Sequence, residues 1–241
     1  MSAENWTNRN QRRGAAVLLE VLRSEGARYV FGNPGTTELP LIDALVDAPD
    51  IRYVLALQEA SVVAMADGYA QAACRPGVLN LHTTGGLGHG LGNLLNAHVS
   101  GTPLVGTAGQ QDSRHTLTDP LLYGDLVSIA THAVKWAQEV THADQIPILV
   151  RRAFHGCQTA PTGPVFLSLP MDVMEEMIAV DIGEVSTIDR AAVAGSLDRL
   201  AEYLAAIPPG KFWVHTPRRV PSSRLSRKKP QNSDPVPKVH D

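Results

Sequence analysis

Glu59 stands at the junction between two segments of different character. The run 51–57, IRYVLAL, is aliphatic and β-branched and predicts a buried strand, whereas the small residues of 58–72 predict a helix. At the carboxyl end of a strand in an open α/β sheet, a carboxylate faces the crevice where ligands bind, and there it can serve as a general acid or base. The helix dipole alone also favours an acid in the first turn of a helix, so the spacing leaves a purely structural role open.

His82 ends another apolar run, 77–82, which predicts a strand. Its imidazole suits proton transfer because it ordinarily titrates near pH of about 6.5, although a single histidine at a strand end can equally be structural. The segment 83–92, TTGGLGHGLG, predicts a glycine-rich turn into a helix over 91–100, where backbone amides could meet a phosphate. Neither GxGxxG nor GxxxxGK[ST] occurs in it, so a dinucleotide or Walker-type site is not indicated.

The elements that must position these residues alternate along the chain. Strands are predicted at 28–31, 51–57, 77–82, 102–108, 133–137 and 163–169, and helices at 13–24, 38–46, 58–72, 91–100, 125–131 and 142–158. The segment 112–123 is predicted to be an irregular loop that could cover a site. Alternating strands and helices imply parallel pairing with right-handed crossovers. We therefore expect a doubly wound, mostly parallel α/β sheet with helices on both faces, ending near Pro170.

Composition sets the outer limits of the interpretation. The 241 residues suffice for one large domain, or for one domain plus part of a second, and 44% hydrophobic residues can build a core. A net charge of −3 points to neither nucleic acid nor a membrane as partner. Cys74 and Cys157 have neither disulfide-framework nor zinc-ligand spacing. No signal peptide or membrane span is recognisable, so a cytoplasmic protein is expected.

The two ends of the chain differ from its body. Residues 211–241 carry eight Lys and Arg against two acids, whereas residues 1–210 carry thirteen against twenty-two. We expect a flexible start at 1–12, one domain at 13–180, a linker with the first helix of a truncated second domain at 181–210, and a disordered tail at 211–241. The basic tail could be a solvated segment, a patch for nucleic acid or acidic surfaces, or the product of a frameshift, and we favour the last interpretation.

Six segments, in this order, resemble the N-terminal pyrimidine-binding domain of thiamine-diphosphate enzymes. They are GNPGTTELPLIDAL, YVLALQEASVVAMADGYAQA, GVLNLHTTGGLGHGLGNLLNAH, GTPLVGTAGQQ, AVKWA and GPVFLSLPMDV. The resemblance covers about residues 13–180, which implies the thiamine-diphosphate-binding fold. Within the family, LQEA, NLH and TAGQQ most resemble benzoylformate decarboxylase, with acetolactate synthase and benzaldehyde lyase as more distant fits.

The resemblance implies roles for particular residues in cofactor chemistry. Glu59 matches the glutamate that hydrogen-bonds N1′ of the aminopyrimidine and promotes its imino tautomer. Its apolar neighbours predict partial burial and a raised pKa, which would let the carboxyl group share a proton with a ring nitrogen. His82 matches the histidine that transfers protons to and from the reaction intermediates. Pro34 and Gly35, in the turn after the strand at 28–31, are expected to bind the cofactor.

The resemblance also implies a substrate pocket for a 2-keto acid. Thr36 takes the place of a serine that holds the substrate carboxylate, and its extra methyl group favours smaller or differently posed substrates. Leu121 and Leu122 match pocket-lining leucines, and Gln110 matches a polar residue at the next strand end, with His82 completing the set. His89 has no family role that we can assign.

The family's magnesium signature is missing from this sequence. These enzymes hold the cofactor diphosphate through Mg²⁺ in a C-terminal domain with a GDG segment, and the chain has only Gly124-Asp125-Leu126. We therefore expect no metal ligands here, Mg²⁺ supplied by an absent domain, and a homo-oligomer or a separate C-terminal-half chain that completes the site. The chain by itself is expected to be inactive.

Three functions remain in view from the sequence. The preferred one is the cofactor-binding domain of a 2-keto-acid decarboxylase or lyase of the benzoylformate decarboxylase type, truncated or split. The second is the same domain with acetolactate synthase chemistry, in which carboligation to a second keto acid replaces protonation. The third is a non-catalytic protein that dimerises through this domain and uses its basic tail.

Overall fold

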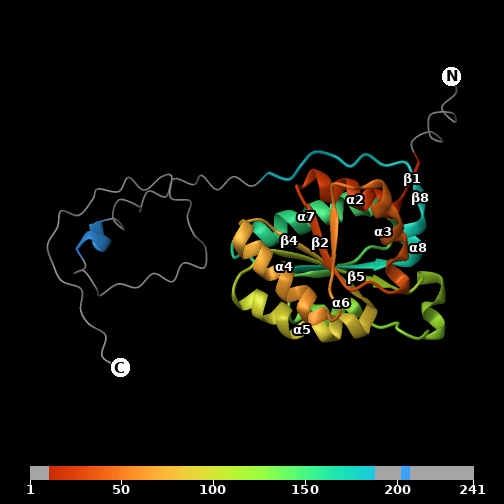
Figure 1. Cartoon of the computed structure of the whole chain (residues 1–241), viewed down its shortest axis with the longest axis horizontal. Coiled ribbons are helices and arrows are strands. Elements are labelled where there is room, and N and C mark those ends of the chain that lie inside the picture. Colours follow the sequence, from red (N-terminus) through yellow and green to blue (C-terminus); the bar gives the residue numbers. More distant parts are fainter. Residues whose placement is uncertain (1–10, 188–201, 207–241) are drawn as a thin grey trace, which may run out of the picture.

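The protein forms one parallel sheet covered by helices (Figure 1). The computed structural model describes residues 11–187 and 202–206. Within that part of the chain the strands of the main sheet are β2 (Tyr29–Gly32), β3 (Arg52–Leu55), β4 (Gly77–His82), β5 (Leu104–Gln110), β6 (Ala137–Glu139) and β7 (Val165–Pro170). Their order is β3-β2-β4-β5-β7-β6, and every neighbouring pair is parallel. The predicted α/β architecture is therefore confirmed.

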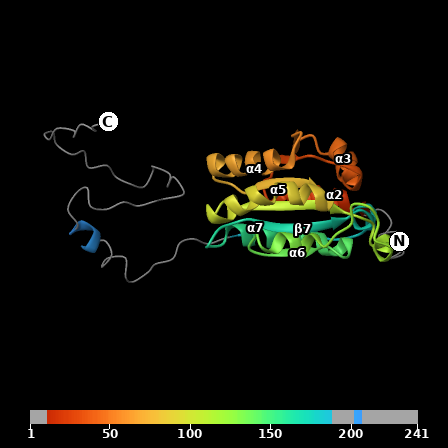
Figure 2. The same ribbon diagram turned by 90° about the horizontal axis from the view of Figure 1, so that it is seen from below.

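Helices pack on both faces of this sheet. The α-helices are α2 (Gly14–Ser24), α3 (Leu39–Ala44), α4 (Glu59–Ala73), α5 (Thr83–Val99), α6 (Leu126–Thr131), α7 (Ile146–Gln158) and α8 (Met171–Glu175). Short 3-10 helices are η1 (Thr36–Glu38), η2 (Leu45–Asp47), η3 (Ser113–Thr118) and η4 (Ala143–Gln145). One core cluster joins α2, α3, α7 and α8 to the sheet, and the other joins α4, α5 and α6 to its opposite face. Figure 1 shows α2 and α7 above the strands and α5 below them, and Figure 2 views the fold from the side of α5 and α6.

Burial follows position in the sheet. All residues of β5 and β7 are buried, because each of these central strands has a neighbour on both sides and helices on both faces. β3 lies at the edge, and Leu55 is 61% exposed. The prediction of a buried strand at 51–57 is therefore wrong in its burial, because strand propensity does not reveal which strand lacks a second neighbour.

The glycine-rich segment is helical rather than a turn. α5 begins at Thr83, directly after β4, and includes all the glycines from Gly85 to Gly92. Glycine ordinarily costs a helix about 1 kcal/mol per residue. Here a Cβ at Gly90 would lie 3.1 Å from Val63 and 3.2 Å from Leu81, so the glycine allows α5 to approach α4 and the sheet closely. Tertiary packing thus outweighs local propensity.

A second, two-stranded antiparallel sheet connects the beginning and the end of the main described region. β1 (Arg12–Arg13) pairs with β8 (Met177–Ile178), and this pairing was not predicted.

The strand predicted at 133–137 begins later, at Ala137. The helix expected within 181–210 can be compared only at 202–206, which the structure describes and which is helical at 202–205. The tail at 211–241 lies outside the described residues.

Candidate functional site

The candidate residues lie at the carboxyl edge of the sheet, where the chain changes direction. From β2 the chain continues to β3 on one side, and it then returns to β4 on the other side of β2. The connections that leave β2 and β4 therefore diverge, and in open α/β sheets the crevice expected at such a point is the usual ligand-binding position. The segment 33–38 follows β2, Glu59 begins α4 after β3, and His82 ends β4.

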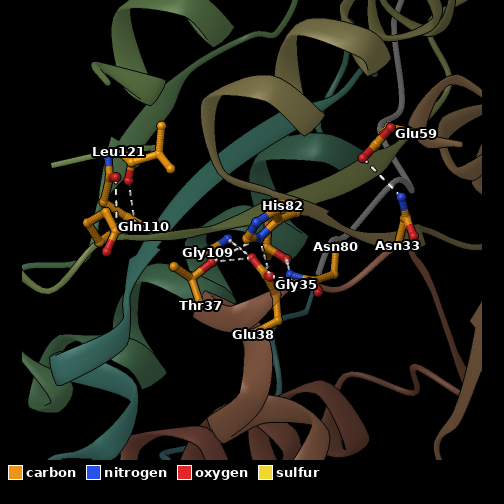
Figure 3. Close-up of polar contacts among 12 residues, drawn as sticks. Asn33, Gly35, Thr37, Glu38, Glu59, Asn80, His82, Gly109, Gln110 and Leu121 are labelled. Atoms are coloured by element: carbon orange, nitrogen blue, oxygen red, sulfur yellow. Dashed lines mark hydrogen bonds and ion pairs between the residues drawn. The ribbon is translucent and has the colours of Figure 1, made fainter. Parts of the chain in front are cut away.

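Glu59 is held in this crevice by two side chains from other elements. Its Oε1 accepts a hydrogen bond of 3.0 Å from Nδ2 of Asn33, and its Oε2 lies 3.2 Å from Nδ1 of His89 (Figure 3 shows Asn33). The residue is only 9% exposed although it stands in the first turn of a helix. Gln58 caps that helix by accepting from the amide of Ser61, so the cap does not depend on Glu59. An acid that served only to interact with the helix dipole would lie at the surface and would not be held by side chains of other elements.

The pKa of Glu59 is lowered rather than raised. Burial pushes its pKa up, but hydrogen bonds from its own backbone N–H, from Asn33 and from His89, together with the charge of His89, bring it below the ordinary value. The prediction of a raised pKa is therefore wrong for this chain, because the apolar neighbours in the sequence did not reveal the donors Asn33, in the turn after β2, and His89, in α5. Glu59 is ionised and accepts hydrogen bonds.

His82 is held by a buried carboxylate, Glu38. The Nδ1 atom of His82 lies 2.7 Å from Oε2 of Glu38 and 3.2 Å from the hydroxyl of Thr37 (Figure 3). Glu38 also accepts from the amides of Gly35 at 2.7 Å and Gly109 at 2.9 Å. Its side chain is 1% exposed, against 23% for His82. Glu38 thus fixes the imidazole on its Nδ1 side and leaves Nε2 for other partners.

Gly35 and Gly109 leave room for the contact between Glu38 and His82. A Cβ at Gly35 would lie 2.5 Å from Nε2 of His82, and a Cβ at Gly109 would lie 2.8 Å from Cδ of Glu38. Distances below 3 Å exclude a methyl group unless the facing side chain moves. Gly35, predicted to bind cofactor, therefore lies against the imidazole, and Pro34 beside it is half-buried in the same turn.

A buried polar network lies behind the crevice. The hydroxyl of Tyr53 donates to Oδ1 of Asn80 at 3.1 Å, Nδ2 of Asn80 donates to Thr107 at 3.1 Å, and Thr107 donates to the carbonyl of Leu79. Burial, and secondarily the charge of Glu38, raise the pKa of Tyr53, so its phenol stays protonated and donates. The network crosses β3, β4 and β5 and ties together the strands that position the site.

Thr83 has a strained backbone directly after His82. Its φ of +49° lies in the left-handed region, which is unfavourable for a β-branched residue. The side chain is fully buried, and its hydroxyl has no hydrogen-bond partner in the described part of the chain. Strain of this kind often accompanies functional sites. The turn that aims His82 therefore has an energetic cost that packing must offset.

The predicted substrate residues are less closely gathered. Gln110 is 2% exposed and donates to the carbonyl of Gly124 at 2.8 Å, so it anchors the loop 112–123. Leu121 is 85% exposed and Leu122 is 38% exposed, so neither lines a closed pocket within the described residues. Thr36 is exposed in η1, whereas the next hydroxyl, Thr37, is buried beside His82.

Sequence reasoning missed the residues that hold the two candidates. Glu38 was taken as an ordinary helix residue, Asn33 as part of a turn, and His89 as a histidine without a role. No signal in the sequence marked Glu38, because a charged residue at the start of a helix is ordinarily exposed, and only the packing of η1 against β4 and β5 buries it. Nothing in the linear sequence indicated that α5 would bring His89 to Glu59.

These residues fit a polar heterocycle more readily than a metal. The ionised Glu59 can accept a hydrogen bond from a ring nitrogen. A Cβ at Gly86 would lie 3.2 Å from Oε1 of Glu59, so the glycine keeps space beside the carboxylate. No group of three or more His, Cys, Asp or Glu suited to a metal occurs in residues 11–187 and 202–206. Among the same residues no helix is both long and apolar enough to cross a membrane.

Comparison with known proteins identifies similar chains. Residues 12–146 match the family described as thiamine pyrophosphate enzyme, N-terminal TPP binding domain. The chain is 43% identical to benzoylformate decarboxylase of Pseudomonas aeruginosa over 155 residues, which are 64% of this chain and 29% of that protein. It is 32% identical to the acetolactate synthase large subunit of Haemophilus influenzae over 161 residues, which are 67% of this chain and 28% of that protein.

A solved structure shows the same similarity to benzoylformate decarboxylase. Benzoylformate decarboxylase from Polynucleobacter necessarius superposes with a TM-score of 0.73 at 38% identity, over 81% of this chain and 37% of that one. The chain thus spans less than a third of the length of the two curated relatives. Since the family match covers more than half of the chain, the chain belongs to the thiamine pyrophosphate enzymes and contains their N-terminal TPP-binding domain, which resembles that of benzoylformate decarboxylase.

Proposed function

We propose that this chain supplies the pyrimidine-binding half of a thiamine-diphosphate-dependent 2-keto-acid decarboxylase site. The observation that carries the proposal is the fixed, ionised carboxylate of Glu59 at the crevice beside β2. Thiamine diphosphate, when bound, supplies the carbon nucleophile and electron sink that decarboxylation of a 2-keto acid needs. Glu59, Pro34 and Gly35 are the residues of this chain that would hold it.

Glu59 is suited to share a proton with a ring nitrogen. In the open crevice, hydrogen bonds from Asn33 and His89 favour its charged form. A docked ring would cover the carboxylate and displace water, which raises a carboxyl pKa and brings it closer to that of its partner. Glu59 would then hold a proton at one oxygen while Asn33 fixes the other.

His82 is placed to move protons on the substrate side. Glu38 anchors Nδ1, so Nε2 is the nitrogen that can take or give a proton in the crevice. Thr36 is exposed nearby in the chain and offers a hydroxyl to a substrate carboxylate, whereas Gln110 supports the site through the loop that it anchors. Leu121 and Leu122 would line the pocket once a further chain or domain covers them.

We infer that the site is completed from outside the described residues. In this proposal Mg²⁺ and the diphosphate are held by a C-terminal domain, on a second copy or on a separate chain. The partition into 13–180, 181–210 and 211–241 belongs to the same proposal. The chain alone is then expected to show no turnover of benzoylformate or pyruvate, and measurable turnover would refute the incomplete-site proposal.

A chimera tests the cofactor role directly. Residues 12–180 of this chain would replace the matching part of the Pseudomonas aeruginosa relative, and aldehyde release from benzoylformate would be measured. We expect activity in the chimera and a loss of at least about 100-fold in Glu59→Gln, since general acid–base groups contribute about 10²–10⁴-fold. Asp67→Asn, on the same helix α4 but outside the crevice, is the matched control.

The outcomes separate the three functions. Acetolactate from pyruvate, rather than aldehyde, would favour the carboligase, which the similarity to acetolactate synthase makes a specific second candidate. If Glu59→Gln behaves like Asp67→Asn, Glu59 has no cofactor role. A non-catalytic function would be favoured if deletion of residues 211–241, but not Glu59→Gln, abolished the biological effect of the chain.

A further inference from the structure

A surface depression lies at the amino ends of the strands, whereas Glu59 and His82 lie at their carboxyl ends. It has a volume of about 600 Å³ and is formed at the amino ends of β2 and β3, next to the end of α2. Four arginines line it, together with one acid and one aromatic residue: Arg23, Arg28, Arg52, Arg75, Asp50 and Tyr29. This size falls within the range of about 300–1,000 Å³ that is usual for small-molecule sites.

The depression carries uncompensated positive charge. Asp50 is engaged by Arg23, whose Nε and Nη2 donate to its two carboxylate oxygens at 2.6 Å and 2.7 Å. Arg28, Arg52 and Arg75 make no side-chain hydrogen bond or ion pair with any residue in the described ranges. Three guanidinium groups thus share one concave surface without a carboxylate to balance them. Like charges brought together repel one another, so a bound anion would relieve this cost.

The fold brings these arginines together from three separate segments. The backbone N–H of Arg52 donates to the carbonyl of Arg28 at 2.8 Å, so the two residues stand side by side where β3 and β2 begin. Arg75 follows α4, and its Nη1 would be 3.9 Å from a Cβ at Gly26. Gly26 has a φ of +83°, so the turn after α2 stays tight and without a side chain beside Arg75.

We propose that this depression is an anion site for a ligand with at least two phosphate groups. Arginine presents a planar fork of donors that matches phosphate oxygens in pairs. A phosphate monoester carries a charge of about −1.5 to −2 at neutral pH, so two phosphate groups balance three guanidinium groups, whereas a single carboxylate does not. The inference does not rest on the proposed function, because the two sites lie at opposite ends of the strands.

Calorimetric titration of the full chain with inorganic diphosphate tests the proposal. We expect one site per chain, and at least about tenfold weaker binding in the double variant Arg52→Gln/Arg75→Gln, because it removes two of the three unpaired guanidinium groups and their charge-assisted hydrogen bonds. The matched control is Arg218→Gln/Arg219→Gln, which removes the same charge from the basic tail. It is expected to bind diphosphate within twofold of the parent chain.

Two results would overturn the proposal. One is the absence of saturable binding to the parent chain at low salt. The other is an equal loss of affinity in both double variants, which would indicate non-specific attraction to total charge or to the tail. Glu59→Gln is expected to keep diphosphate binding, so failure of the cofactor proposal and failure of this one are distinguishable. Orthophosphate, as a second probe, is expected to bind more weakly than diphosphate.

Discussion

Replacement of Glu38 is the most demanding test of the site's construction. Its buried carboxylate accepts hydrogen bonds from the amides of Gly35 and Gly109 and from the hydroxyl of Thr37, and it pairs with Nδ1 of His82. Glu38→Ala leaves the two amides without their acceptor, and an unsatisfied buried donor costs about 1–3 kcal/mol. We therefore expect Glu38→Ala to lower the free energy of unfolding by about 2–6 kcal/mol, which is the cost of two such donors.

Urea denaturation followed by circular dichroism and by tryptophan fluorescence, to which Trp136 of the folded domain contributes, would measure this loss. Asp43→Ala is the control, because Asp43 is an exposed acid paired with Arg13 at the surface and such pairs contribute at most about 1 kcal/mol. Should Glu38→Ala fail to fold, Glu38→Gln keeps one accepting oxygen and is expected to lose roughly half as much. A loss below about 1 kcal/mol in Glu38→Ala, with an unchanged urea dependence, would refute the reasoning.

Three further predictions concern local features. Gly88→Ala is expected to stabilise the protein by about 0.5–1 kcal/mol in the same assay, because the added methyl group would meet nothing within 4 Å beyond the adjacent backbone of its own helix. Gly90→Ala should show no gain, because Val63 and Leu81 crowd that position. Gly35→Ala should displace the imidazole of His82, and imidazole nitrogen NMR shifts that match those of the parent would contradict this. Hydrogen bonds from the Arg114 side chain lower the pKa of Asp112 to about 2, so this pair stabilises the folded chain above pH of about 4 and ceases to do so as the pH falls through about 2. The stability difference between the parent chain and Arg114→Gln should vanish over that window, and a difference that persists below it would contradict the assignment.

Residue order and local pattern sufficed for the architecture. The run at 77–82 is a strand with the predicted bounds, and the alternation of strands and helices gave the parallel sheet. The same rules failed at α5, because glycine content favours a turn when only local propensity is considered. They failed again at β3, whose exposure depends on its place at the edge of the sheet.

The candidate site was predicted only in part. Glu59 and His82 could be singled out because each stands where a strand ends, and strand ends converge at one edge of a parallel sheet. Their partners could not be singled out in the same way. Glu38 is far from His82 in sequence, as Asn33 is from Glu59, and neither pair follows a helical or strand period.

The sequence by itself therefore determined the order of elements, the family, and two candidate side chains at the carboxyl ends of the strands. Only the tertiary structure decided that Glu59 is ionised and that His82 is anchored through Nδ1. It also brought Arg28, Arg52 and Arg75 to one surface at the far edge. The physical reason is that hydrogen bonds and charges act between atoms a few ångströms apart, and these distances are set by packing between segments rather than by spacing along the chain.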